Sequence, residues 1–380
     1  MDYPNGILVG RAHVPGHAHP RIVTVRGEEL FDITAPGMAT VRDIAESGRA
    51  ADHVRTAPGV SLGNAKAVLA NSVAAATDAK LPSLLSPIDL QAIKASGVTF
   101  VVSLLERVIE EQARGDNSRA DALRTEILDL IGMDLSELVP GSEAAMKVKA
   151  ALIEKGVWSQ YLEVGIGPDA EIFTKGQPMS SVGYGAEVGL HPASSWNNPE
   201  PEVALLVTST GAIIGATLGN DVNLRDVEGR SALLLGKAKD NNASASLGPF
   251  VRLFDGTFTL ETIKNSEIAL RVEGEDGFVL EGHSSMNQIS RTPESLVAAT
   301  LGTHHQYPDG LVLYLGTMFA PVKDRDGAGK GFTHKLGDVV SISTESLGTL
   351  SNRVNLSTKC PPWTYGSSHL LRDLAKADLL

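Results

Sequence analysis

The fold of this 380-residue chain is decided by one stretch, Trp196-Asn197-Asn198-Pro199-Glu200-Pro201-Glu202-Val203-Ala204-Leu205-Leu206-Val207. Its apolar end has high β-propensity, so it predicts a strand that begins near Glu200 and Glu202. Side chains two residues apart on a strand project from the same face. Two carboxylates aimed one way repel each other unless a cation lies between them. On its own, such a pair is more simply interpreted as the solvated end of an acidic strand.

A further carboxylate follows one predicted hairpin later. Thr208-Ser209-Thr210-Gly211 predicts a turn, and the apolar run 212–218 predicts a second strand that ends near Asp221. Pairing within this hairpin can bring Asp221 next to the two glutamates. Three converging carboxylates form an all-oxygen site that suits Mg²⁺, with Mn²⁺ or Ca²⁺ as alternatives. The two segments contain neither His nor Cys, which makes zinc a poorer match.

The rest of the chain predicts an α+β fold with two parts. Residues 1–80 alternate like a β-hairpin up to Thr34 and then become alanine-rich and helical, which predicts a small N-terminal α+β domain for packing or subunit contact. Residues 81–380 predict a β-rich catalytic domain. It contains a mostly helical block, 101–157, with helices expected over 101–113, 120–131 and 142–155, and it ends in a short helix over 367–375.

Composition excludes several classes of partner. The net charge of −12 argues against nucleic acid and means that an anionic substrate needs local cations or a metal. The sequence contains no apolar run near 18 residues and no basic-then-apolar leader, so we expect neither a membrane span nor a signal peptide. The single cysteine, Cys360, excludes an intrachain disulfide and fits a reducing cytoplasm.

Several short motifs, in order over roughly 165–355, resemble those of the fumarylacetoacetate hydrolase superfamily. The family's core pattern is E-x-E, then N-D-V-x-x-R-D, then K, then L-G-P. The corresponding segments here are Phe173-Thr174-Lys175, Glu200-Pro201-Glu202, Asn220-Asp221-Val222-Asn223-Leu224-Arg225-Asp226, Lys239, Leu247-Gly248-Pro249, Leu315-Gly316-Thr317, Gly337-Asp338-Val339 and Leu347-Gly348-Thr349-Leu350.

The resemblance implies a mixed β-roll fold and a divalent metal held by Glu200, Glu202 and Asp221. In that family the metal chelates the carboxylate and 2-oxo group of a pyruvate-like substrate. A Lewis acid on the keto oxygen stabilises an enolate and acidifies the neighbouring C3 proton.

The other polar residues of the matched motifs are assigned to the substrate by the same resemblance. Lys239, Lys175 and Arg225 would neutralise its carboxylate or the developing charge, with structural ion pairing as the alternative. Thr317 would donate a hydrogen bond to the carboxylate, or only close a strand end. Outside the matched motifs, Ser285 in the segment 283–286, together with Arg291, is a candidate contact for the distal hydroxyl of the substrate, and a simple turn is the alternative.

One departure from the family bears on the reaction. Hydrolases of the superfamily often carry an H-x-x-E pair on a lid helix, and the matching positions here are Ser103 and Glu106. A serine cannot remove a proton from water near pH 7 as an imidazole can. Elimination is therefore favoured over hydrolysis. The candidate catalytic residues are Lys239, Glu106, Glu171 and Ser103, with the acid and base roles left open.

The whole chain resembles a narrower subgroup, the 2-keto-3-deoxypentonate dehydratases of oxidative pentose breakdown. Matching segments include 97–111, 158–164, 196–202, 237–244 and 305–310. The resemblance implies Mg²⁺-dependent dehydration of 2-keto-3-deoxy-D-xylonate or -arabinonate to 2-oxoglutarate semialdehyde by a cytoplasmic homodimer or homotetramer. The alternatives are an acylpyruvate hydrolase with the same metal site and a non-catalytic binding protein.

Overall fold

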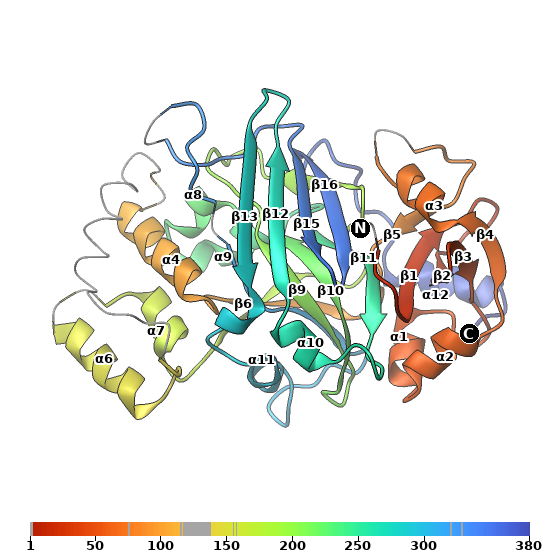
Figure 1. Ribbon diagram of the computed structural model, residues 1–380, viewed down its shortest axis with the longest axis horizontal. Helices are drawn as coiled ribbons and strands as arrows, with labels where there is room; N and C mark the ends of the chain where they lie inside the picture. Colours follow the sequence, from red (N-terminus) through yellow and green to blue (C-terminus); the bar gives the residue numbers. More distant parts are fainter. Residues whose placement is uncertain are drawn as a thin grey trace.

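Two β-sheets with helices at both ends form the structure, which is a computed structural model (Figure 1). This mixed arrangement confirms the expected α+β fold class. The residues that the structure describes are 3–74, 77–114, 116, 138–154, 156, 158–319, 321–327 and 330–380. The helix expected over 120–131 lies outside them.

The larger sheet has eleven strands and runs through the whole molecule. Its order is β4-β3-β2-β1-β11-β10-β9-β14-β6-β7, and β5 pairs with β1 beside this path. The strands are β1 (Leu8–His13), β2 (Arg21–Arg26), β3 (Glu29–Asp32), β4 (Val60–Asn64), β5 (Ser83–Leu85), β6 (Ala92–Gly97), β7 (Glu171–Gly176), β9 (Pro201–Val207), β10 (Ile213–Asp221), β11 (Ala245–Leu253) and β14 (Leu311–Tyr314).

A second sheet of five strands packs against the first. Its order is β13-β12-β15-β16-β8, in which β16 and β8 pair in parallel and the others are antiparallel. The strands are β8 (Glu187–Leu190), β12 (Glu267–Glu273), β13 (Val279–Ser285), β15 (Val339–Thr344) and β16 (Gly348–Leu356).

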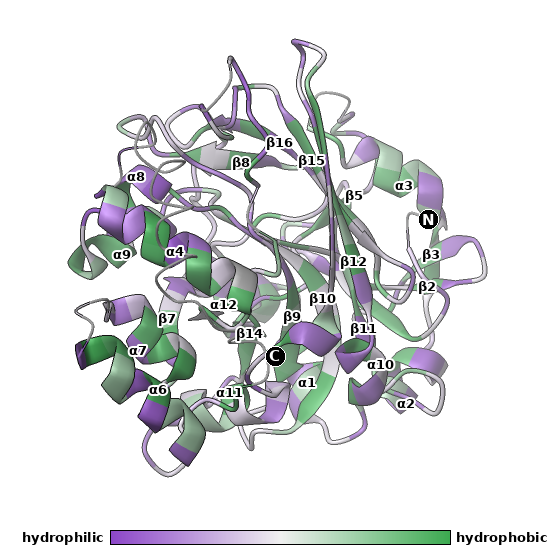
Figure 2. Cartoon of the chain, turned by 60° about the vertical axis from the view of Figure 1, so that its left-hand side comes forward, coloured by the Kyte–Doolittle hydropathy of each residue, from purple (hydrophilic) through white to green (hydrophobic). Residues whose placement is uncertain are grey.

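Strand β9 lies at the centre of the core, and all seven of its residues are buried. Its alternate side chains enter two different apolar clusters: Val203 and Leu205 join one, and Ala204 and Leu206 join the other. A strand covered on both faces has a continuous apolar sequence rather than an alternating one, as the run after Glu202 has. In Figure 2 the central strands are coloured green, and much of the purple lies on the surrounding loops and outer helix faces.

The helical block lies at one end of the molecule. It comprises α4 (Val101–Ala113), α6 (Glu143–Glu154) and α7 (Gln160–Ile166), which share an apolar cluster that includes Leu104, Leu152 and Leu162 (Figure 1). The helices predicted over 101–113 and 142–155 are confirmed by α4 and α6. Helix α4 has buried residues on its charged side as well, since Arg107 and Glu110 are both buried.

The N-terminal region lies at the opposite end and joins the same large sheet. Strand β1 pairs with β11 in an antiparallel arrangement, so the first residues of the chain extend the sheet that contains β9. Helices α1 (Val41–Glu46), α2 (Ala50–Thr56), α3 (Ala65–Asn71) and the C-terminal α12 (Ser367–Lys376) lie here (Figure 1). Strand β4 interrupts the stretch that was expected to be helical.

Short helices connect the strands near the middle of the chain. They are α8 (Arg225–Glu228), α9 (Leu235–Lys239), α10 (Leu260–Lys264), α11 (Pro293–Thr300) and the 3₁₀ helices η1 (Ala232–Leu234) and η2 (Met286–Gln288). Among the described helices, none has the length and apolar character needed to cross a bilayer.

Candidate metal centre and active site

Hairpin pairing between β9 and β10 brings three carboxylates together. Gly219 lies opposite Glu202 in the register, and the Asp221 amide donates to the Glu200 carbonyl at 3.0 Å. Each of Glu200, Glu202 and Asp221 offers an oxygen within 4.8 Å of the other two, and all three residues are buried. The prediction that Asp221 lies beside the two glutamates is confirmed.

This set of donors fits a hard divalent cation such as Mg²⁺. It consists of carboxylate oxygens alone, which are the ligands that Mg²⁺ prefers in proteins. Burial, together with repulsion from Asp221 and Glu200, raises the pKa of Glu202 well above its usual range. The Gly316 amide donates to Glu202 at 2.7 Å. A dication at this position would remove the repulsion that makes the ionised form of Glu202 unfavourable.

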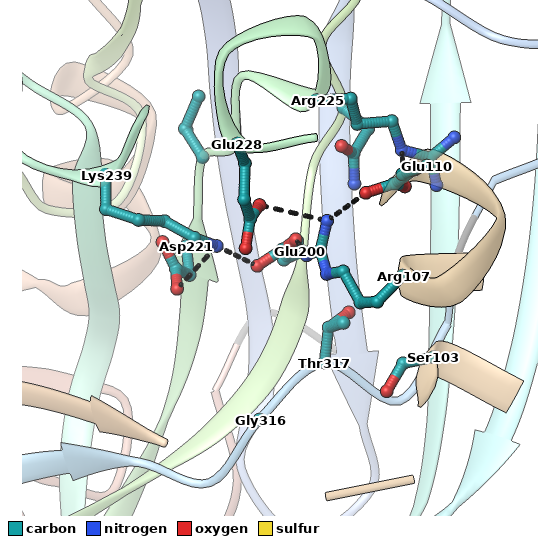
Figure 3. A network of polar contacts seen from close by, with 12 residues as sticks. Ser103, Arg107, Glu110, Glu200, Asp221, Arg225, Glu228, Lys239, Gly316 and Thr317 are labelled. Carbon is teal, nitrogen blue, oxygen red and sulfur yellow. Dashed lines mark hydrogen bonds and ion pairs between the residues drawn. The ribbon is translucent and has the colours of Figure 1, made fainter. Parts of the chain in front are cut away.

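Two lysines contact the acidic triad from different elements. Lys239, at the end of α9, has its Nζ 2.5 Å from Glu200 and 3.2 Å from Asp221 (Figure 3). Lys175, on β7, lies 2.8 Å from the other oxygen of Asp221. Burial lowers the pKa of Lys239, but the charges of Asp221 and Glu200 outweigh this effect and raise it above its ordinary value. Lys239 is therefore held as a cation.

Strand β7 presents a fourth acidic group, beyond the triad, to the same place. Glu171, Phe173 and Lys175 alternate along β7, and Glu171 and Phe173 line a small cavity that also contains the triad. Burial, reinforced by the charge of Glu228, raises the pKa of Glu171 to about 7. A carboxyl group that titrates near neutrality can both accept and donate a proton, which is the property required of an acid–base catalyst.

The backbone beside Glu171 is constrained. Gly97 pairs with Glu171 across β6 and β7, and a Cβ at position 97 would collide with the Glu171 carboxylate. The next residue, Val98, lines the cavity and adopts a φ of 56°, which is rare for a β-branched residue. Strained backbone of this kind clusters at functional sites.

Helix α4 reaches the triad through Arg107, a residue to which the sequence assigned no role. Its NH2 group contacts Glu200, and its NH1 group lies 2.7 Å from Glu110 and 3.0 Å from Glu228 (Figure 3). Burial raises the pKa of Glu200, but Arg107 and Lys239 outweigh it and hold this pKa at about 2. Glu110 in turn forms an ion pair with Arg225 at 3.0 Å.

The charges of this buried cluster do not balance. Six carboxylates and four cations leave an excess of two negative charges when all are ionised, which one divalent cation would neutralise. The carboxylates are Glu110, Glu171, Glu200, Glu202, Asp221 and Glu228, and the cations are Arg107, Lys175, Arg225 and Lys239.

The remaining candidates lie at different distances from the cavity. Thr317 lines it, although its hydroxyl donates to the Phe319 carbonyl at 3.1 Å. Ser103 donates to the carbonyl of Phe100, the residue before α4, at 2.9 Å. Glu106 is largely buried on α4, and Ser285 lies at the end of β13 with no hydrogen-bond partner for its hydroxyl among the described residues. None of Ser103, Glu106 and Ser285 lines the cavity as the described residues form it.

Arg107, Glu110 and Glu228 are the residues of this cluster that the sequence analysis missed. Arg107 and Glu110 lie on the predicted helix 101–113, one and four residues after Glu106. Their spacing was informative, because Glu and Arg residues three or four positions apart on a helix often form ion pairs. That signal does not distinguish a solvated helix face from one packed on a strand end.

Comparison with known proteins identifies a family and two related enzymes. The model of the fumarylacetoacetate hydrolase C-terminal family matches residues 141–355. The chain is 31% identical to 2-dehydro-3-deoxy-D-arabinonate dehydratase of Saccharolobus solfataricus, over 50% of this chain and 60% of that enzyme. It is 26% identical to the probable 2-keto-3-deoxyxylonate dehydratase of Haloferax volcanii, over 88% and 95% of the two chains.

A solved structure shares the fold. It is 2-keto-3-deoxy-D-arabinonate dehydratase complexed with magnesium and 2,5-dioxopentanoate, with a TM-score of 0.64, 20% identity, and coverage of 92% of this chain and 99% of that one. The expected fumarylacetoacetate hydrolase-like fold is thus confirmed, and the family model spans more than half of the sequence. The chain belongs to the fumarylacetoacetate hydrolase family.

Proposed function

We propose that this protein is a Mg²⁺-dependent dehydratase that converts a 2-keto-3-deoxypentonate to 2-oxoglutarate semialdehyde, with Mn²⁺ as an alternative metal. The observation that carries the proposal is the cavity in which Glu171 faces the same space as the acidic triad and Lys239. The names of the two curated relatives, both dehydratases of such sugar acids, support the choice of reaction.

Glu200, Glu202 and Asp221 would hold the cation. When bound, a divalent cation supplies a Lewis acid that draws electron density from the 2-oxo group and acidifies the C3–H bond. Lys239 remains positively charged and, with its Nζ beside the triad, would offset the negative charge that develops on the 2-oxo acid. Lys175 contacts Asp221 and would fix its orientation.

Glu171 is the residue that we assign to proton transfer. Its carboxylate would remove a proton from C3, and the C3–H electron pair would form the C3–C4 double bond as the C4–O bond breaks. The protonated Glu171 would then deliver that proton to the departing hydroxide, which leaves as water, so Glu171 ends in its starting form. The remaining unsaturated 2-oxo acid isomerises to 2-oxoglutarate semialdehyde as two hydrogens move from the C5 carbinol to C3 and C4.

Glu106 and Ser103 remain candidate contributors from α4, and Arg225, Thr317 and Ser285 remain candidate substrate contacts. Glu106 and Ser103 take the positions of the family's H-x-x-E pair, and Ser103 cannot provide the base that water attack requires. This difference favours elimination over the alternative reaction, hydrolysis of the carbon–carbon bond of an acylpyruvate.

A comparison of two separate substrates provides the test. Purified protein with Mg²⁺ is incubated separately with 2-keto-3-deoxy-D-xylonate and with an acylpyruvate, and the products are identified by mass spectrometry. The proposal predicts 2-oxoglutarate semialdehyde from the first and no cleavage of the second. Turnover of the acylpyruvate without dehydration of the sugar acid would overturn it. Samples treated exhaustively with EDTA serve as controls and should lose activity until Mg²⁺ is restored.

A further inference from the structure

The guanidinium of Arg107 contacts carboxylates through both of its terminal nitrogens. Its NH1 group lies between Glu110 and Glu228, at 2.7 and 3.0 Å, while its NH2 group contacts Glu200. The side chain is 8% exposed, so these carboxylates take the place of water as its partners. Figure 3 shows Arg107 reaching from α4 into the middle of the cluster.

Glu200 is fully engaged by cations in this arrangement. Arg107 contacts one of its oxygens, and the Nζ of Lys239 lies 2.5 Å from the other. Glu200 is also a member of the acidic triad whose oxygens converge. A divalent cation and the NH2 group of Arg107 are therefore alternative partners for the same carboxylate. The contact with Arg107 therefore opposes the binding of a cation by Glu200, and by linkage the cation opposes the contact.

When Glu200 binds a metal, the two terminal nitrogens of Arg107 are affected differently. NH1 keeps Glu110 and Glu228, and these two ion pairs hold the guanidinium in place. NH2 loses its partner while still buried at the wall of the cavity, and an unpaired buried donor is unfavourable. An anionic oxygen that enters the cavity restores the missing hydrogen bond.

We infer that Arg107 is a substrate-positioning residue whose NH2 group is held by Glu200 until a metal takes that carboxylate, and then binds an anionic oxygen of the 2-oxo acid. The inference rests on the proposed function, because it requires a metal at the triad and an anionic ligand beside it. It assigns α4 a direct part in ordering the two binding steps, with metal before substrate.

Arg107→Lys is the informative variant because it keeps the positive charge but replaces the two terminal nitrogens of the guanidinium with one ammonium group. A single ammonium group can stay between Glu110 and Glu228, but it cannot also reach Glu200 on the other side. Arg225→Lys is the matched control for the Mg²⁺ titration alone, because Arg225 pairs with Glu110 in the same cluster, at 3.0 Å, and is not paired with Glu200 in the described structure. Both variants keep the net charge, so a general electrostatic effect would change them equally.

Isothermal titration calorimetry measures the two binding steps on the full-length protein. Mg²⁺ is titrated first, and oxalate, an unreactive mimic of a 2-oxo acid, is then titrated into Mg²⁺-saturated protein. We expect Arg107→Lys to bind Mg²⁺ roughly tenfold more tightly than the wild type and to bind oxalate roughly tenfold more weakly. Arg225→Lys should change the Mg²⁺ dissociation constant less than about threefold.

The titrations distinguish a wrong inference about Arg107 from a wrong proposed function. Mg²⁺ binding by Arg107→Lys that is equal to or weaker than that of the wild type, or oxalate binding that is unchanged, would overturn the inference. Arg107→Gln, which keeps an N–H donor for Glu110, replaces the lysine variant if circular dichroism shows that the latter is unfolded. Absence of Mg²⁺ binding in the wild type would instead contradict the metal site itself, whatever Arg107 does.

Discussion

Two buried carboxylates in this molecule, Asp338 and Glu202, have opposite electrostatic environments. Asp338 receives both terminal nitrogens of Arg325, at 2.7 and 2.9 Å, together with the His334 ring and the Lys335 amide, each at 3.0 Å. Burial raises the pKa of Asp338, but these donors outweigh it and lower the pKa to about 2. At Glu202 the effect of burial prevails, and the pKa rises well above its usual range.

The difference separates a structural ion pair from a binding site. Asp338 has as many donors as its oxygens can use, so its charge is already stabilised by the fold. Glu202 accepts one backbone amide, that of Gly316, among the residues that the structure describes, and it faces two further carboxylates. A buried acid with few donors beside two further carboxylates fits a candidate site for a cation.

The largest effect is expected for Glu202→Gln. Loss of one metal ligand should lower kcat by about 10³-fold or more, equivalent to roughly 4 kcal/mol of transition-state stabilisation. The free energy of unfolding in the presence of EDTA should stay the same or rise, because a neutral amide keeps the hydrogen bond from Gly316 and cannot ionise beside Asp221 and Glu200. Steady-state kinetics and urea unfolding measure the two quantities. Activity within tenfold of the wild type would contradict this view of Glu202.

The opposite pattern is expected for Asp338→Asn. Loss of this charge removes one of the two carboxylates that pair with the buried Arg325 and leaves Asp276 as the other, so it should lower the free energy of unfolding by about 1.5–3 kcal/mol. The Mg²⁺ dissociation constant should remain within about threefold of the wild-type value, since Asp338 is not a member of the triad. Urea unfolding and calorimetry test this, and a large loss of metal affinity in a folded variant would remove the distinction between the two carboxylates.

The same contrast predicts a dependence of stability on pH. The folded pKa of Asp338 is about 2, below an unfolded value of about 3.9, so its contribution is present above pH 4 and is lost as the pH falls towards 2. The free energy of unfolding of the wild type should therefore fall more steeply than that of Asp338→Asn between pH 4 and pH 2. Equal slopes would show that the Arg325 pair does not lower this pKa.

The metal triad was predictable from sequence because its members follow from local rules. Residues two apart on a strand share a face, and a short hairpin brings the end of the next strand beside them, as Glu202 and Asp221 demonstrate. The bounds of α4 were predictable for the same reason, since apolar periodicity defines a helix of that length. Strand β4 was missed because its five residues are mostly exposed and lack an apolar pattern.

Glu171→Gln should produce an intermediate effect. Removing the proton carrier is expected to lower kcat by about 10²-fold and to leave the Mg²⁺ dissociation constant within about threefold. With a pKa of about 7 the carboxyl becomes an effective base as the pH rises, so wild-type kcat/KM should increase between pH 6 and pH 8. A bound dication would favour the ionised form of Glu171 and shift this rise in kcat/KM to a lower pH. If the same rise in kcat/KM with pH persists in Glu171→Gln, a group other than Glu171 is responsible for it.

The smallest expected effect is the increase in the free energy of unfolding when Mg²⁺ binds. A ligand that binds only the folded state at ten times its dissociation constant raises the free energy of unfolding by about 1.4 kcal/mol. Mg²⁺ should therefore raise the melting temperature of the wild type and of Asp338→Asn, but not that of Glu202→Gln. Differential scanning calorimetry with and without Mg²⁺ measures the shift, and an equal shift in all three proteins would locate the bound Mg²⁺ elsewhere.

The contacts that sequence could not predict cross between distant elements. Arg107 and Glu200 are 93 residues apart, and their meeting depends on how α4 docks on the end of β9. Helical periodicity gives the apolar face of α4 but not which polar residue points into the cavity. The match to the family's H-x-x-E pair favoured Glu106, whereas the structure aims Arg107, one position and about 100° further around the helix, at the triad.

The most direct test of the central claim is an anomalous-diffraction measurement on crystals that contain Mn²⁺. The account predicts one strong anomalous peak about 2.1 Å from oxygens of Glu200, Glu202 and Asp221. The peak should be absent from crystals of Glu202→Gln grown under the same conditions. Saturating Mn²⁺ with no peak among these three residues in the wild type, or with a peak only at another position, would contradict it.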